Sequence, residues 1–165
     1  MATRTVKILL LVALALMYTL IVFDNTTDFD SNYQFVRHVL MMDSTFPGNH
    51  GMWRALLEPR VHLVFYLSII VWEIATAALL WWGVTVLIRS LHSPAATFNL
   101  AKRVPIIALT LSLLMWLVAF LTIGAEWFLM WQSHTWNGQD AACRMFTVVG
   151  IILLIMLLPE REEQP

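Results

Sequence analysis

Charge is what this sequence lacks most. Only 13% of its 165 residues are charged, whereas about 25% is usual in a soluble domain. Charged side chains are too few to cover a water-exposed surface, and this shortage excludes a soluble globular fold. The net charge of −1 also provides no basic field, so we predict no nucleic-acid partner.

Cysteine is nearly absent as well, since Cys143 is the only one. A single cysteine excludes an internal disulfide and a zinc site built from several cysteines. The sequence also has no glycine-rich phosphate loop and no recognisable Ser/His/Asp or Cys/His pattern. We therefore predict a protein that is not an enzyme and that needs no cofactor.

Hydrophobic residues, in contrast, make up 59% of the chain, and the mean hydropathy is +0.72. Four apolar runs are long enough for transmembrane helices, which need roughly 20 residues each. These runs cover residues 6–23, 61–88, 104–131 and 141–158. They predict an all-α fold, namely an integral membrane four-helix bundle that forms a single domain (1–165) in the lipid bilayer.

Charges around the first run predict the orientation. Arg4 and Lys7 precede it, whereas Asp24, Asp28 and Asp30 follow it. Basic residues stay on the cytoplasmic side of a membrane. With four spans, both termini are then cytoplasmic, and the long loop 24–60 lies outside.

The loop 24–60 is predicted to be a folded cap of two small helices. Ser31 and Gln34 form a plausible capping box for the first of them. Apolar residues at helical spacing follow, namely Phe35, Val36, Val39, Leu40 and Met42. A second short helix is expected near residues 52–57.

The inner linker 89–103 and the C-terminal tail have a different character. Ser93 and Pro94 are typical of a helix start, which predicts a short surface helix over 95–103. Its Lys102 is expected at the lipid headgroups. The tail 159–165 is polar and acidic, which favours disorder.

The most specific pattern in the chain is a pair of stretches in the loop, FDNTTD at residues 23–28 and NYQFVRHVLMMD at residues 32–43. Its candidate site residues are Asp24, Asn25, Asp28, Asn32, Arg37, His38 and Asp43. The pattern resembles a family of bacterial predicted small integral membrane proteins. The resemblance covers nearly the whole chain, including the four-span layout. It implies four helices in a bacterial inner membrane and no established activity.

Two carboxyl groups lie inside the predicted spans, where a charge is costly. In a helical projection Glu73 shares one stripe of the second span with His62 and Tyr66. This stripe predicts either a polar vestibule that takes a small ligand or cation, or a structural group. In the structural case Glu73 is neutral and donates a hydrogen bond, because burial favours the uncharged form.

Glu126, in the third span, is also expected to face inward. Its projected stripe carries small and polar residues, namely Ser112, Met115, Ala119, Thr122 and Ser133. An ion pair with Arg144 of the fourth span would satisfy its charge. The large side chains of Trp81, Trp116 and Trp127 would then lie at the periphery or at the membrane interfaces.

Four histidines fall on the predicted outer side, and they raise the question of a metal. They are His38, His50, His62 and His134. Imidazole and carboxylate ligands suit zinc, and a haem would need two facing histidines, such as His62 and His134. No pair has the i, i+4 spacing of a ligand pair on one helix. Metal and haem therefore stay open alternatives that the spacing does not favour.

The leading hypothesis for function is an accessory or interaction subunit of a membrane complex. Such a subunit would bind a partner protein, or another copy of itself, through the cap or a face of the bundle. The alternative is a periplasm-facing membrane protein that binds a ligand or metal. Its site would use His38, His62, Asp43 and Glu73.

Overall fold

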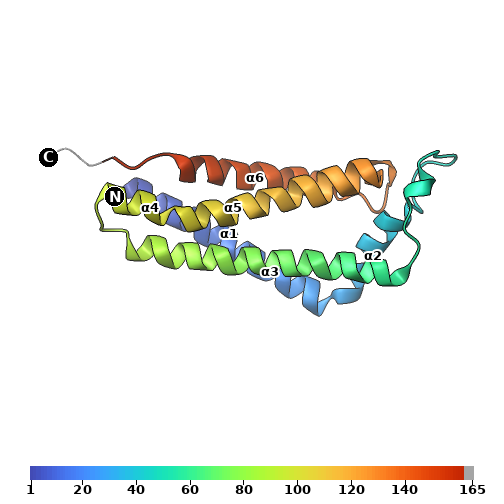
Figure 1. Cartoon of the computed structure of the whole chain (residues 1–165), viewed down its shortest axis with the longest axis horizontal. Coiled ribbons are helices and arrows are strands. Elements are labelled where there is room, and N and C mark those ends of the chain that lie inside the picture. The colour runs from blue at the N-terminus through green and yellow to red at the C-terminus, as the bar shows by residue number, and fades with distance from the viewer. Residues whose placement is uncertain (162–165) are drawn as a thin grey trace.

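The computed structural model describes residues 1–161, and it confirms the predicted fold class. The described residues form helices and connecting turns, without a strand. Four helical segments are long and apolar enough to cross a membrane, namely Ala2–Thr27 (α1), Pro59–Arg89 (α3), Ala95–Trp127 and Gln139–Leu157 (α6). They lie side by side along the long axis of the molecule, with both termini at one end (Figure 1).

Shorter elements complete the chain. They are α2 (Phe29–Met41), the 3₁₀ turns η1 (Met52–Arg54) and η3 (Met130–Gln132), and the three parts of the third long segment, α4 (Ala95–Ala101), α5 (Arg103–Leu114) and η2 (Met115–Trp127). The first long helix extends past the predicted run 6–23 at both ends. A helix does begin at Ala95, but α4 forms the start of the third long segment rather than the separate surface helix predicted over 95–103.

The core lies between the four long segments. α1 packs against α3 and α6, and α5 packs against both α3 and α6. At the centre the Tyr18 and Ser112 hydroxyl groups are 2.6 Å apart, and the Trp116 indole N–H donates to the Tyr18 oxygen over 2.9 Å. Gly83 lets α3 approach α5 closely, since a Cβ there would lie 3.1 Å from Pro105. Trp116 was predicted at the periphery, and this prediction is wrong because its side chain completes the buried hydrogen-bond chain.

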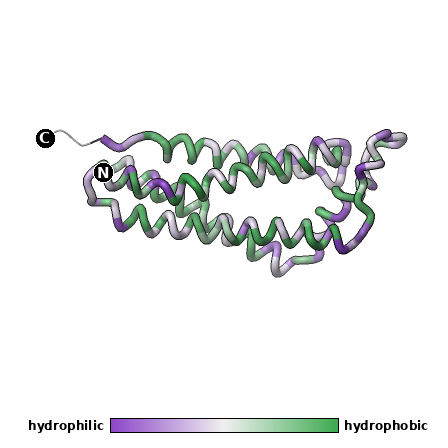
Figure 2. The backbone as a smooth tube through the Cα atoms, viewed as in Figure 1, coloured by the Kyte–Doolittle hydropathy of each residue, from purple (hydrophilic) through white to green (hydrophobic). Residues whose placement is uncertain are grey.

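The outer surface of the bundle is apolar. Hydrophobic residues run along the long helices, and hydrophilic ones gather towards the two ends of the molecule (Figure 2). Large apolar side chains exposed on the long helices include Leu9, Leu16, Leu20, Val71, Ile151 and Leu154. Such a surface suits contact with lipid chains rather than water.

The outer half of the third segment is wound as a π-helix, η2. The Phe128 main-chain amide donates to the Ile123 carbonyl five residues earlier, over 2.9 Å. The Thr122 side-chain hydroxyl donates to the Leu117 carbonyl, which is also five residues earlier. An i→i+5 turn is wider than an α-helical turn. Each residue therefore advances less than 100° around the axis, and faces projected for an α-helix drift out of register.

The loop between α1 and α3 forms a packed cap at the end away from the termini. Val39, Leu40 and Met42 are buried against Ala125, Phe128 and Met130 at the outer end of the third segment. The folded cap predicted for the loop is thus confirmed for its first helix, which packs through its apolar residues. Its expected start at Ser31 is wrong, because α2 begins at Phe29 after Asp28 and no side chain caps it. The expected second helix near 52–57 is only the turn η1.

Candidate functional site

The predicted stripe on α3 is present as a row of buried polar side chains. His62, Tyr66 and Glu73 are all almost completely buried. The Asn25 side-chain amide donates to a Glu73 carboxyl oxygen over 2.7 Å. The Tyr66 hydroxyl donates to the Asn25 carbonyl over 2.8 Å. Glu73 and Tyr66 thus meet at one residue of α1.

Asn25 reaches this position because α1 continues to Thr27. The sequence 24–28 is rich in turn-forming residues and was predicted to leave the helix. Instead, Asn25 lies in the last turn of α1, and the Asp28 amide donates to the Asp24 carbonyl there. Tertiary contacts to α3 outweigh the weak helix propensity of Asn and Thr. Asn25 was part of the loop pattern, but nothing in the sequence linked it to Glu73.

His62 closes the row at the outer end of α3. Its Nε2 is 2.7 Å from the Leu56 carbonyl oxygen, which ties the cap to α3. Its Nδ1 is buried and has no hydrogen-bond partner among the described residues. Neither the terminal pocket nor the cap groove described below is lined by His62, Tyr66 or Glu73. Through these contacts the row joins α3 to α1 at Asn25 and to the cap at Leu56.

Glu126 and Arg144 lie elsewhere. Both side chains are exposed, and neither takes part in an ion pair within residues 1–161. The inward placement predicted for Glu126 is wrong, because the π-helical turns of η2 rotate it out of the projected stripe. In its place Gly124 and Ala125 are buried.

The remaining residues of the loop pattern do not converge on one point. His38 Nδ1 lies 2.6 Å from an Asp43 carboxyl oxygen, and the His38 ring stacks on Trp136 with centroids 4.5 Å apart. The Asn32 amide donates to the Asp28 carbonyl, and Arg37 donates to Gln34. The described part of the chain contains no group of three His, Cys, Asp or Glu residues able to hold a metal ion.

The cap carries an exposed aromatic surface, which we call the aromatic face. It consists of Phe46, Trp53, Arg54, Trp127 and Trp131. Trp53 packs edge-on against Trp127 with centroids 5.8 Å apart, and Phe46 packs likewise against Trp131. The Arg54 guanidinium lies over both Trp53 and Trp127, at 5.8 and 5.5 Å. Trp53 is nevertheless 76% exposed.

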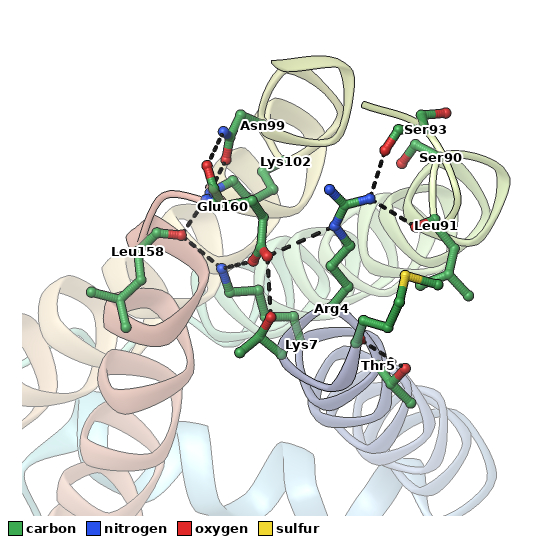
Figure 3. A network of polar contacts seen from close by, with 12 residues as sticks. Arg4, Thr5, Lys7, Ser90, Leu91, Ser93, Asn99, Lys102, Leu158 and Glu160 are labelled. Atoms are coloured by element: carbon green, nitrogen blue, oxygen red, sulfur yellow. Dashed lines mark hydrogen bonds and ion pairs between the residues drawn. The ribbon is translucent and has the colours of Figure 1, made fainter. Parts of the chain in front are cut away.

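A second polar group of residues, the Glu160 cluster, lies at the end with the termini. It consists of Arg4 and Lys7 of α1, Lys102 after α4, and Glu160 (Figure 3). Lys7 Nζ is 2.6 Å from a Glu160 carboxyl oxygen, and Arg4 Nε is 3.7 Å from the other. Lys102, which was predicted at the lipid headgroups, is buried here among the helices.

Glu160 also anchors the chain that follows α6. Its main-chain amide and carbonyl both bond to the Asn99 side chain, over 3.0 and 3.1 Å. Burial would raise the pKa of Glu160, but the hydrogen bond and charge of Lys7, the Thr3 hydroxyl and the charge of Arg4 together hold that pKa below its usual value. The disorder predicted for the tail is therefore wrong at Glu160, and residues 162–165 lie outside the described chain.

Two pockets accompany these features. The terminal pocket, about 940 Å³, opens beside the Glu160 cluster and is lined by Arg4, Lys7, His92, Glu160 and Arg161 together with apolar residues of α1 and α6. The cap groove, about 270 Å³, lies between α2, α3 and η2 and is almost entirely apolar. The sequence had shown the basic residues of the terminal pocket singly, but it had not shown that they meet.

Four apolar spans, a lipid-compatible outer surface and polar groups gathered at the two ends define a multi-pass integral membrane protein. The chain matches, over residues 3–159, the family described as "Predicted small integral membrane protein (DUF2165)". It belongs to that family, as the resemblance of its loop pattern implied. Comparisons with curated proteins and with solved structures gave no match.

Proposed function

We propose that this protein is a non-enzymatic accessory subunit of a bacterial inner-membrane complex, and that it binds a partner protein through the aromatic face of its cap. The observation that carries the proposal is the exposed Trp53–Arg54–Trp127 group. Trp and Arg dominate the residues that provide most of the binding energy in protein interfaces. Trp53, at 76% exposure, is the most exposed large hydrophobic side chain of the described residues.

The rigidity of this surface supports a binding role. Arg54 lies over both tryptophans, and its Nε donates to the Gly51 carbonyl over 3.3 Å. The Leu56 amide donates to the Leu40 carbonyl over 2.9 Å, which joins the loop to α2. A surface that is ordered before binding loses less conformational entropy when a partner arrives.

Orientation is part of the proposal. Arg4, Lys7 and Lys102 gather at the end that holds the termini, and Asp24, Asp28 and Asp30 lie near the other end of α1. The positive-inside rule then favours cytoplasmic termini and a periplasmic cap. The partner would accordingly meet the protein at the periplasmic surface.

Site-specific photo-cross-linking in living cells tests the proposal. A photoreactive phenylalanine derivative, which keeps an aromatic ring at this position, replaces Trp53, and the same amino acid replaces Leu20, a lipid-facing residue of α1 that is 62% exposed. We expect a discrete protein adduct from position 53 and none from position 20. An adduct of twice the chain mass would replace the accessory-subunit assignment with a homo-oligomer. Lipid adducts alone at position 53 would identify the aromatic face as a membrane anchor and refute the proposal.

A matched pair of substitutions provides a second test. Trp53→Ser should abolish the adduct formed by a photoreactive residue at the neighbouring position 52, because it removes the central contact. Trp82→Ser, on the exposed side of α3 at 57%, should leave the adduct unchanged. Equal effects of the two substitutions would mean that the cap has no specific role.

A further inference from the structure

The Glu160 cluster buries more positive than negative charge. Arg4, Lys7 and Lys102 are 8%, 4% and 4% exposed, yet Glu160 is the only carboxylate that an ion pair joins to any of them within the described residues. Their other hydrogen bonds go to neutral carbonyl oxygens. Arg4 donates to the carbonyls of Leu91 and Ser93, and both lysines donate to that of Leu158. A cation removed from water is costly unless an anion compensates it, so this cluster favours a second anion.

The terminal pocket gives such an anion access to the cluster. Arg4 and Lys7 form part of its wall, and the exposed side chains of His92 and Arg161 also line it. Among its described lining residues Glu160 is the only acid. The volume of about 940 Å³ lies in the usual range for small-molecule sites.

The other part of the pocket wall is apolar. Val6 of α1, Ile155 of α6 and Leu158, the residue directly after α6, contribute to it. Val6 is 50% exposed on the side of α1, which is long enough to cross a membrane, and Leu158 is 61% exposed. The pocket thus joins a cationic region at the end of the bundle to an apolar flank that faces the hydrocarbon of the bilayer.

From this juxtaposition we infer that the terminal pocket binds the phosphate headgroup of an anionic phospholipid from the adjoining leaflet. The phosphate would meet Arg4, Lys7 and Arg161, and the start of an acyl chain would lie along Val6 and Ile155. Basic pockets between transmembrane helices recognise anionic headgroups through the same charge-assisted hydrogen bonds. A soluble phosphate offers the same oxygens but has no chain for the apolar wall.

Glu160 acts in this arrangement as an internal competitor of the phosphate. Its carboxylate already forms ion pairs with Lys7 and Arg4, so it lowers the positive electrostatic potential that a phosphate would meet. Its main chain is held separately by Asn99. Glu160→Gln therefore removes the negative charge while the position of the tail is retained.

Native mass spectrometry of the full chain tests the inference. The protein is released from nanodiscs that contain equal amounts of phosphatidylglycerol and phosphatidylcholine, and retained lipids are counted. We expect one retained phosphatidylglycerol and no phosphatidylcholine. Arg161→Gln should lower the occupancy about fivefold, since a basic residue near an anionic lipid contributes on the order of tenfold or less to binding. Glu160→Gln should lower the phosphatidylglycerol fraction needed to half-fill the site by a similar factor.

Matched controls make the outcome decisive. Arg89→Gln removes an exposed cation at the last residue of α3, at the same end of the bundle as the pocket but outside its lining. Glu126→Gln removes an exposed carboxylate at the cap end. Neither control should change lipid retention. Each variant is first checked for a cooperative melting transition, which shows that it is folded. Equal retention of both lipids, or equal effects of variants and controls, would overturn the inference. Displacement of phosphatidylglycerol by millimolar inorganic phosphate would refute a lipid as the ligand and would assign the pocket to a soluble phosphate.

Discussion

Two carboxyl groups hold the first helix against the rest of the bundle, one towards each end. Near the cap, Glu73 of α3 accepts a hydrogen bond from Asn25. At the end with the termini, Glu160 pairs with Lys7 and Arg4. Between them Tyr18 joins α1 to the third segment through Ser112. In an apolar solvent such polar contacts select one arrangement of helices, because an unpaired polar group there is costly.

The Asn25–Glu73 contact predicts unequal losses of stability for two substitutions. Asn25→Ala removes the donor and should lower the free energy of unfolding by about 1 kcal/mol, as buried hydrogen bonds in proteins typically contribute. Glu73→Gln keeps an oxygen acceptor at the same place and should cost less than about 0.5 kcal/mol. Unfolding in mixed micelles by titration with a denaturing detergent measures both.

The same pair of variants separates a structural Glu73 from a ligand site. If Glu73 served a vestibule, Glu73→Gln would change the occupancy of a bound ligand in native mass spectrometry while the protein stayed folded. A Glu73→Gln variant less stable than Asn25→Ala would show that the carboxyl group itself, rather than its hydrogen bond, matters.

Glu160 should make the protein sensitive to acid. Its pKa is lower in the folded state than its ordinary value, so its contribution is fully present above the ordinary carboxyl pKa of about 4.3 and is lost as the pH falls through the lowered value. The melting temperature of the wild type should thus fall more steeply than that of Glu160→Gln below about pH 4. Parallel curves for the two proteins would show that the pairing with Lys7 contributes nothing to stability.

At the scale of elements, the cap and the π-helical segment depend on each other. Val39, Leu40 and Met42 of the cap pack on Ala125 and Phe128, which are at the outer end of η2 or directly beyond it. Leu129 then adopts a left-handed conformation with φ of 54°, which turns the chain back towards α6. The cap is therefore a packed extension of the bundle rather than a free loop.

A substitution in the cap core tests this packing. Val39→Asp places a charge among apolar side chains and should destabilise the protein by more than about 2 kcal/mol. His50→Asp introduces the same carboxylate at an exposed loop position and should cost less than about 0.5 kcal/mol. A detergent melting assay compares them. Indistinguishable melting temperatures would mean that α2 does not pack on the third segment in the membrane.

At the scale of the whole molecule, an even number of spans places both termini at one end and the cap at the other (Figure 1). The basic residues of the Glu160 cluster mark one end, and the aromatic face marks the other. The two proposed sites are therefore separated by the length of the bundle, and one would serve each side of the membrane.

Cysteine labelling tests the direction of the molecule in the membrane. In a Cys143→Ser background, Asn49→Cys of the cap should react with a membrane-impermeant maleimide in intact cells, because the positive-inside rule places the cap outside. Thr97→Cys of α4 should react only after permeabilisation. Labelling of Thr97→Cys alone in intact cells would invert the orientation.

Helical periodicity predicted much of the candidate site correctly where the helix is a regular α-helix. The stripe of His62, Tyr66 and Glu73 is present because α3 is an uninterrupted α-helix, for which a rotation of 100° per residue holds. The same projection misplaced Glu126, since η2 has a wider turn that local sequence does not announce. It could not place Asn25 either, because a turn-forming residue stayed helical through contacts to α3.

The sequence by itself determined the class of protein, the four spans and the existence of a folded cap. These follow from hydrophobicity and length, which act locally and are set by the thickness of a bilayer. Only the tertiary structure decided that Arg4, Lys7, Lys102 and Glu160 meet in one cluster beside a pocket and that Trp53, Arg54 and Trp127 share one exposed surface. Each group brings together residues from distant parts of the chain, such as Lys7 with Glu160 and Trp53 with Trp127. Their meeting depends on how the helices pack and where the chain turns, and no local pattern encodes such long-range contacts.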